Sequence, residues 1–226
     1  MTQYGLENIR NLVLLSHSGA GKTSLSEAIL FTAGAINRLG KVEDGTTTSD
    51  YDPAEIKRKI SINLSMLPCQ WKETKINLID TPGYSDFVGE VRAAMRVVEG
   101  AIIVVCAASG VEVGTEQVWS YCEEAKLPRL IFINKMDRTG ADVRGCIQMM
   151  VDRLKTVPLP IQLPIGKEED LQGVIDLITM KAIIYDSHSL GAHFDILDIP
   201  GFYLEEASRQ RDTLIERLAE RNDFLM

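Results

Sequence analysis

One stretch of the sequence has the residue types and spacing of a phosphate-binding loop. It follows an apolar run, leads into a segment with helical spacing, and reads Ser16-His17-Ser18-Gly19-Ala20-Gly21-Lys22-Thr23-Ser24. Small residues in such a loop let backbone N–H groups surround phosphate oxygens, and the N-terminus of the next helix adds positive partial charge. We therefore expect Lys22 to reach the β- and γ-phosphates and the Thr23 hydroxyl to bind Mg²⁺. The pattern asks for glycine at its first position, where this chain has Ser16.

Two further motifs follow the loop in the order that a guanine-nucleotide site requires. They read Asp80-Thr81-Pro82-Gly83-Tyr84 and Asn134-Lys135-Met136-Asp137, and each comes after a strand-like segment. Asp80 would hold Mg²⁺ through water, and Gly83 would let a backbone N–H approach the γ-phosphate. A carboxylate at Asp137 could accept both N1–H and N2–H of guanine, which adenine does not offer. Asn134 and Lys135 would brace the base and the loops around it. The three motifs predict a site for GTP or GDP with Mg²⁺.

Each motif also has a simpler interpretation. A Gly-Lys-Thr sequence can follow a buried strand by chance, the Asp80 motif could be a turn, and Asp137 could cap a helix. The phosphate-binding loop, taken alone, would also fit an ATP-dependent enzyme. The order of the three motifs, each expected at the carboxyl end of a strand, favours the guanine-nucleotide site.

The elements that must position these motifs alternate between strand and helix. Apolar or alternating runs predict strands over 8–15, 60–66, 75–79, 101–108 and 130–133, and helical spacing predicts helices over 22–32, 87–98 and 118–125. The continuous runs 101–108 and 130–133 are typical of strands buried on both faces. We therefore expect a doubly wound, mostly parallel α/β sheet with its ligand at the carboxyl ends of the strands. The polar segment 41–59 is long for a connection, which indicates a functional or disordered loop.

The pattern changes near Pro158 and Pro160. Short strands are predicted over 161–165, 174–177 and 181–185, and after a polar stretch with His188 and His193 a charged helix begins near Tyr203. The residues expected on one side of that helix are Leu204, Ala207, Leu214 and Leu218. We expect one domain over 1–158 and a partial α+β subdomain over 159–226. The last helix has no capping signal at the chain's end, which suggests a truncation or an unusual terminus.

Composition and charge exclude several classes of protein. The chain has 226 residues, of which 45% are hydrophobic and 25% charged, as in soluble globular proteins. No apolar run is long enough to span a membrane, and the N-terminus lacks a secretory signal pattern. A net charge of −8 gives no general footprint for nucleic acid, and the four cysteines show no metal or disulfide spacing. We expect a cytoplasmic monomer without membrane or sequence-specific nucleic-acid partners.

Five segments carry a resemblance to one protein family. Residues 80–87 are similar to switch II of translational GTPases, and residues 105–112 and 115–119 resemble elongation factor G. Residues 134–142 and 160–166 do so as well, and the last segment marks the start of an insertion subdomain peculiar to that family. The resemblance covers essentially the full chain. It implies a P-loop GTPase with an inserted α+β subdomain, Mg²⁺ with GTP or GDP as ligands, and the ribosome as partner of the full-length protein.

Three departures from the family pattern point to the paralogous elongation factor G-like branch. Ser16 and Gly19 stand where the family has Gly and Asp, so any binding of a monovalent cation by an acid at position 19 is lost. Lys59-Ile60-Ser61 stands where the family has Gly-Ile-Thr. Ser61 keeps the hydroxyl that the resemblance assigns to the Mg²⁺ shell when GTP orders switch I, although it could be an ordinary strand residue. Tyr84 stands in place of the family's catalytic histidine, which orients the attacking water.

Tyr84 leaves two functional interpretations open. A phenol with a pKa near ~10 can hydrogen-bond to a water but is no cation near neutral pH. In the first interpretation the chain is a ribosome-stimulated GTPase in which Lys22, Gly83 and Tyr84 act at the reacting phosphate and hydrolysis rearranges switches I and II. In the second it is a GTP-binding regulatory module with little hydrolysis. The family's fifth guanine-site motif follows the insertion subdomain and is not in this chain, so we expect the fragment alone to hydrolyse GTP very slowly.

Overall fold

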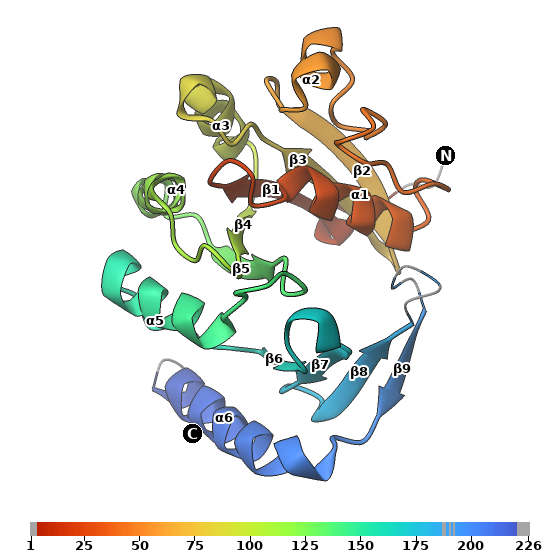
Figure 1. Ribbon diagram of the computed structural model, residues 1–226. Helices are drawn as coiled ribbons and strands as arrows, with labels where there is room; N and C mark the ends of the chain where they lie inside the picture. The colour runs from red at the N-terminus through yellow and green to blue at the C-terminus, as the bar shows by residue number, and fades with distance from the viewer. Residues whose placement is uncertain (1–3, 187–188, 190, 192, 221–226) are drawn as a thin grey trace.

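A five-stranded sheet lies at the centre of the first part of the computed structural model, which describes residues 4–186, 189, 191 and 193–220 (Figure 1). Its strands are β1 (Ile9–Ser16), β2 (Ser65–Trp71), β3 (Thr74–Asp80), β4 (Gly100–Cys106) and β5 (Arg129–Asn134), in the order β2-β3-β1-β4-β5. Strands β3, β1, β4 and β5 are parallel, and β2 pairs antiparallel with β3 at one edge. The doubly wound, mostly parallel sheet predicted from the sequence is confirmed.

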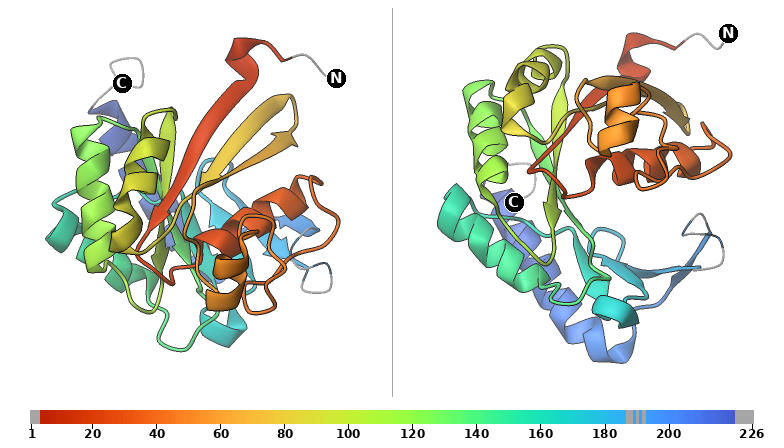
Figure 2. Two further views of the ribbon diagram at one scale, coloured as in Figure 1. Left: turned by 90° about the horizontal axis from the view of Figure 1, so that it is seen from above. Right: turned by 45° about the horizontal axis from the view of Figure 1, so that its top comes forward.

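Helices cover both faces of this sheet (Figure 2). They are α1 (Lys22–Thr32), α3 (Val88–Met95), α4 (Val113–Glu124) and α5 (Val143–Leu154), while the short helix α2 (Pro53–Arg58) lies in the connection between α1 and β2. One core cluster joins α3, α4 and α5 to the sheet through residues such as Met95, Trp119 and Met150. A second cluster joins α1 to the opposite face through Leu30. Short 3-10 helices lie at η1 (Leu6–Asn8), η2 (Ser85–Phe87) and η3 (Glu168–Asp170).

The strand predicted over 60–66 is wrong in most of its length. Strand β2 begins only at Ser65, and residues 60–64 are irregular. The alternation of apolar and polar residues is real, but the backbone N–H groups of Ile62, Asn63 and Leu64 are bound by carboxylates and not by a neighbouring strand. The polar segment before it also contains α2, which begins with a capping box at Asp52.

Strand β5 is not buried on both faces, as its apolar sequence predicted. Leu130 is 48% exposed and Phe132 is 38% exposed. Only one face of this edge strand is covered, because Ile131 and Ile133 pack on the cluster of α3, α4 and α5, whereas Leu130 and Phe132 point to the other face and belong to neither core cluster. Strand β4 lies inside the sheet, with Ile103, Val104 and Val105 buried. A continuous apolar run therefore identified a strand correctly but not its surroundings.

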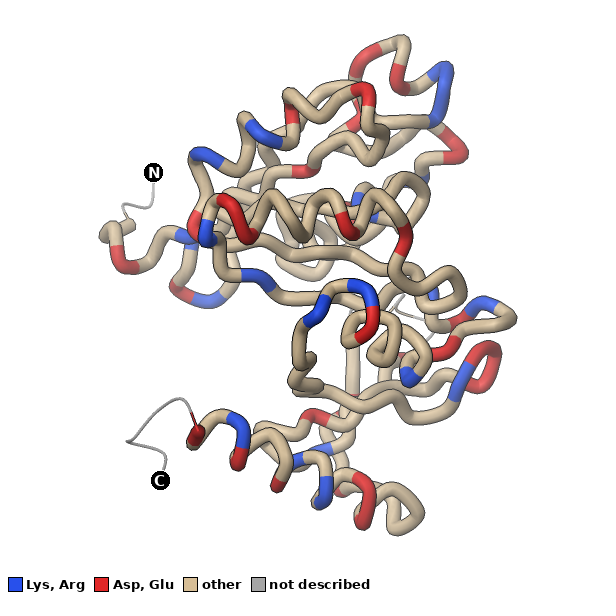
Figure 3. The backbone as a smooth tube through the Cα atoms, turned by 90° about the vertical axis from the view of Figure 1, so that its left-hand side faces the viewer, with Lys and Arg blue, Asp and Glu red and all other residues tan. Residues whose placement is uncertain are grey.

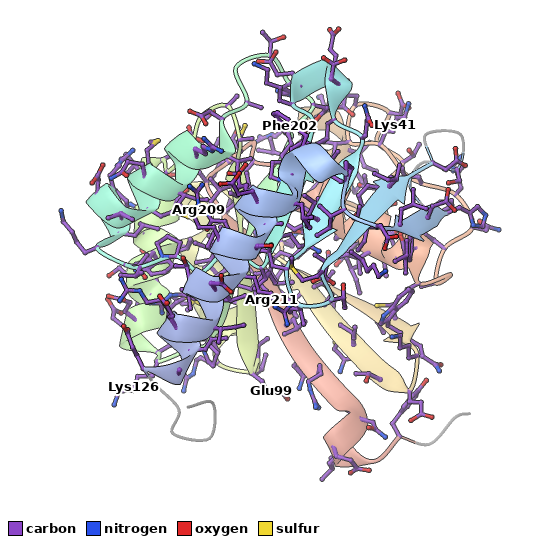
Figure 4. The ribbon with its side chains drawn as sticks, turned by 90° about the horizontal axis from the view of Figure 1, so that it is seen from below. Lys41, Glu99, Lys126, Phe202, Arg209 and Arg211 are labelled. Atoms are coloured by element: carbon purple, nitrogen blue, oxygen red, sulfur yellow. The ribbon has the colours of Figure 1, made fainter. Side chains whose placement is uncertain are left out.

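A four-stranded antiparallel sheet forms the second part of the chain. Its strands are β6 (Gln162–Ile165), β7 (Gly173–Asp176), β8 (Lys181–Tyr185) and β9 (Phe194–Leu197), in that order. Helix α6 (Gly201–Ala219) packs on this sheet through Ala207 and Leu214, and Arg211 donates to the carbonyl oxygen of Leu177 at 2.5 Å (Figure 4). Leu204 and Leu218, expected on the same side, are 50% and 40% exposed.

The surface charges of the described residues are mixed. Figure 3 shows acidic and basic positions interspersed along the chain, including along α6. Of the predicted polar stretch, His188 lies outside the described residues. Among the helices that the structure describes, none has the length and apolar character needed to cross a membrane.

Candidate nucleotide and magnesium site

The predicted phosphate-binding loop connects β1 to α1 as its sequence required. Gly19 and Gly21 have φ values of 77° and 98°, in the left-handed region that favours glycine. A Cβ atom at Gly21 would lie 2.5 Å from Asn134 Nδ2, so the close approach of the guanine motif also requires this glycine. The loop therefore has the backbone shape and the small side chains that a phosphate group needs.

Lys22 lies buried at the start of α1 and donates a hydrogen bond from Nζ to Ser16 Oγ at 2.7 Å. Burial lowers the pKa of Lys22 to about 8, although Asp80 and Asp50 act in the opposite direction. A Cβ atom at Gly83 would lie 2.7 Å from Lys22 Nζ and 2.8 Å from Ser18 Cα. Ser16, which departs from the loop pattern, thus provides the acceptor for Lys22, and Gly83 permits the Asp80 motif to pack against the loop.

Four side chains form a continuous polar cluster beside Lys22. Thr23 Oγ1 donates to Asp80 Oδ2 at 2.9 Å and lies 3.2 Å from Ser61 Oγ, which in turn donates to Asp50 Oδ1 at 2.7 Å. Three of the four were predicted from the sequence. Asp50 was missed, because an acid inside a long polar loop is expected to be solvated unless the fold brings it back to the site.

The cluster fits a magnesium ion. Asp80 is buried, and its Oδ1 atom makes no hydrogen bond within the described part of the chain, although the Ser49 hydroxyl, which is also unpartnered, is near enough to lower the pKa of this carboxyl. Burial raises the pKa of the Asp80 carboxyl to about 6, against the opposing effects of Lys22 and Thr23. A hard cation with oxygen ligands would satisfy that oxygen and favour the ionised carboxylate. The hydroxyl and carboxylate oxygens of Thr23, Ser61 and Asp80 are ligands of the kind that Mg²⁺ prefers, directly or through water.

The guanine motif contacts the loop from the end of β5. Asn134 Nδ2 donates to the carbonyl oxygen of Ala20 at 3.0 Å, and Lys135 Nζ donates to that of Gly19 at 2.6 Å. Met136 accepts the backbone N–H of Glu168 at 3.1 Å, which joins the motif to the second part of the chain. The Asp137 side chain is exposed. Asn134 and Lys135 brace the loop as expected, while Asp137 is left accessible to a base.

Comparison with known proteins identifies the family of this chain. Residues 7–212 match the family described as elongation factor Tu GTP binding domain. The chain belongs to this family. It is 44% identical over 223 residues to elongation factor G of Salinibacter ruber, covering 99% of this chain and 32% of that protein. A crystal structure of a protein from Thermus thermophilus matches with a TM-score of 0.89 and 35% identity, covering 96% of this chain and 32% of the other.

These matches confirm the resemblance to elongation factor G over nearly the whole chain. The family is one of GTP-binding domains, so the guanine-nucleotide interpretation of the three motifs holds at the level of the family. The chain spans about a third of the length of these two relatives (32% of each). We use switch I below for residues 40–64 of this GTP-binding domain and switch II for residues 80–87.

Switch II of the GTP-binding domain begins with two anchored residues. Thr81 Oγ1 donates to the carbonyl oxygen of Leu14 at 2.6 Å, and Pro82 is buried. Tyr84 differs from them, because it is 44% exposed and its hydroxyl has no hydrogen bond to any described residue. A hollow of about 20 Å³, lined in part by Ser16, Gly83 and Tyr84, has room for a single water.

The side chains of two other predicted loop residues of this domain, His17 and Ser24, make no hydrogen bond with the polar cluster. His17 Nδ1 accepts the backbone N–H of Gly114 at 3.3 Å, and Nε2 lies 3.5 Å from Glu112 Oε1. His17 therefore contacts the start of α4. The Ser24 side chain is exposed on α1. Both were predicted as site residues because they are neighbours of Lys22 and Thr23 in the sequence. The turn of the backbone directs their side chains elsewhere.

Proposed function

We propose that the chain binds Mg²⁺ with GTP or GDP and is the nucleotide-binding part of a ribosome-dependent translational GTPase. The observation that carries this proposal is the buried Thr23–Asp80 pair with its unpartnered Oδ1 atom, next to Lys22 and the glycine loop. A buried acid beside a buried amine and two hydroxyls is suited to binding a magnesium phosphate.

In the proposed mechanism the chain acts by position and charge. The loop N–H groups and Lys22 hold the β- and γ-phosphates, and Gly83 and Tyr84 place a water in line with the γ-phosphate. Thr23, Ser61 and Asp80 would hold Mg²⁺, which would neutralise charge on the phosphates. Loss of the γ-phosphate would release switches I and II. Asn134, Lys135 and Asp137 would select guanine.

Several further properties belong to the same proposal. We place the division between the GTPase domain and the insertion subdomain at 158/159, between α5 and β6. The full-length protein would act in the cytoplasm as a monomer, with the ribosome and a guanine nucleotide as partners and no sequence-specific nucleic acid. We also expect this chain alone to hydrolyse GTP very slowly.

The test is multiple-turnover GTP hydrolysis by the full-length protein, measured as phosphate release with and without ribosomes. We expect ribosomes to raise the rate by several orders of magnitude, because completing a nucleotide site in trans gives about 10³- to 10⁵-fold in other GTPases. Binding of GTP without any stimulation by ribosomes would contradict the proposal.

The second candidate function is a GTP-binding regulatory module that hydrolyses little. The exposed, unbonded Tyr84 favours it, because a phenol without a partner has no group to fix its orientation toward a water. In this case nucleotide exchange, and not hydrolysis, would end the active state.

Ribosome-stimulated hydrolysis by the unsubstituted protein separates these two functions, and Tyr84→His tests what the tyrosine contributes. We expect the substitution to preserve or raise ribosome-stimulated hydrolysis, because an imidazole can orient a water and also carry a proton near neutral pH. The measurement is the ribosome-stimulated rate constant at saturating GTP, with Tyr185→His, an exposed tyrosine of β8 in the second sheet, as control. Complete loss of turnover would mean that the tyrosine has a specialised function.

A further inference from the structure

Three glutamates hold the backbone of switch I in place. Glu27 of α1 accepts the N–H groups of Gly40 at 3.0 Å and Thr48 at 2.5 Å. Glu55 of α2 and Glu90 of α3 hold the other end of the segment, which leads into β2. Both Glu27 and Glu55 are buried, at 1% exposure each.

The carboxylates of Glu55 and Glu90 bind three consecutive backbone N–H groups. Glu55 Oε1 accepts those of Ile62 and Asn63, both at 2.9 Å, and Glu90 Oε2 accepts that of Leu64 at 3.1 Å. The other oxygen of Glu55 accepts the N–H of Asp52 at 3.1 Å. We refer to Glu55 and Glu90 as the carboxylate clasp. The clasp takes the place of the backbone hydrogen bonds that a neighbouring strand would make. Each N–H needs an acceptor, and a carboxylate is a stronger acceptor than a carbonyl.

The clasp lies directly beside the magnesium ligands. Ser61 precedes the clasped residues, and its hydroxyl contacts Thr23 Oγ1 at 3.2 Å and Asp50 at 2.7 Å. Because Ile62 and Asn63 are held from one side, the backbone at Ser61 has little freedom to turn its hydroxyl away from Thr23. Glu90 lies on α3, the helix that follows switch II, so its bond to Leu64 connects the end of switch I to that helix.

We propose that Glu55 and Glu90 are positioning residues of the magnesium site. Glu55 holds Ser61 at the Thr23–Asp80 pair, and Glu90 makes that position depend on α3 and hence on switch II. The inference rests on the proposed function, in which Ser61 joins the Mg²⁺ shell when GTP is bound. The clasp should therefore strengthen binding of the triphosphate and leave binding of the diphosphate almost unchanged.

The experiment measures the affinity of the 226-residue chain for mant-GDP and for mant-GppNHp, a GTP analogue that is not hydrolysed, over a Mg²⁺ titration. We expect Glu90→Ala and Glu55→Gln to weaken GppNHp about tenfold, with less than a twofold change for GDP, since a hydrogen bond to a charged group is lost. Glu55→Gln loses such a hydrogen bond because the single oxygen of the amide cannot replace the two carboxylate oxygens that accept three N–H groups. The Mg²⁺ concentration for half-maximal GppNHp binding should rise similarly.

Two variants keep the test specific. Glu90→Gln should restore most of the GppNHp affinity, because its carbonyl oxygen can still accept the Leu64 N–H. Glu73→Gln changes an exposed glutamate in the turn between β2 and β3 and should behave as the unsubstituted chain. Thermal unfolding of each variant identifies any general loss of stability. If Glu55→Gln is unfolded, the comparison of Glu90→Ala with Glu90→Gln tests the inference.

An equal loss of affinity for both nucleotides, or no change for either, would overturn the inference while leaving the proposed function intact. A chain that binds neither nucleotide before any substitution would overturn the proposed function and the inference together.

Discussion

Replacing Lys22 with methionine is expected to weaken binding of Mg²⁺–GTP by about two to three orders of magnitude. The ammonium group is buried at the loop, where removing one partner of a buried, hydrogen-bonded charge pair costs about 2–5 kcal/mol. Methionine has a similar shape and no charge, so the phosphates would lose their cation without a new clash.

The same substitution should not destabilise the chain. Burial lowers the pKa of Lys22 to about 8, so the folded state binds this proton less tightly than the unfolded state does. Below about pH 8 that difference opposes folding, and removing the amine relieves it. Removing the amine also takes away the cation that favours the ionised Asp80 carboxylate, which acts in the opposite direction. We therefore expect the melting temperature without nucleotide to change little.

Isothermal titration calorimetry with GDP and GTP, together with thermal unfolding, checks both parts of this prediction. Lys57→Met, which changes an exposed lysine at the end of α2, is the matched control and should leave the affinity unchanged. Nucleotide affinity that survives Lys22→Met would mean that the loop does not hold the phosphates.

Replacing Asp137 with asparagine is expected to exchange guanine for xanthine as the preferred base. A carboxylate accepts two N–H groups of guanine, whereas an amide offers one acceptor and one donor. The amide fits xanthine, which has a carbonyl oxygen where guanine has its amino group. A site that leaves buried polar groups unpaired rejects the wrong ligand strongly, so GDP affinity should fall by at least ~10²-fold while XDP affinity rises.

Competition of GDP, XDP and ADP against mant-GDP or mant-XDP measures this exchange. Measuring both nucleotides provides the control, because a substitution that only disturbed phosphate binding would weaken GDP and XDP equally. Preference for ADP in the unsubstituted chain would instead support the ATP-dependent enzyme. The Asp137 side chain is exposed, so the substitution should leave the melting temperature unaltered.

The sequence identified the parts of the site that are contiguous. The loop from Ser16 to Thr23, the acid Asp80 and the motif around Asp137 each depend on neighbouring residues, because a phosphate or a base is bound by a short run of backbone and one or two side chains. Apolar runs likewise predicted β1, β3 and β4 to within a few residues, since a strand buried in a parallel sheet has few other patterns open to it.

Contacts between distant residues were decided by the tertiary structure alone. Asp50 belongs to a polar loop in the sequence, yet it lies 2.7 Å from Ser61 because switch I folds back over α1. The alternation in residues 60–64 predicted a strand, but the N–H groups of residues 62–64 donate to Glu55 and Glu90 instead of to a neighbouring strand. No local pattern contains that information, because the glutamates come from two helices on either side of the segment. Residue types and spacing thus determined which chemistry the chain can perform. The fold determined which acids hold the switch that the chemistry needs, because a buried N–H takes the strongest acceptor within reach, wherever that acceptor lies in the sequence.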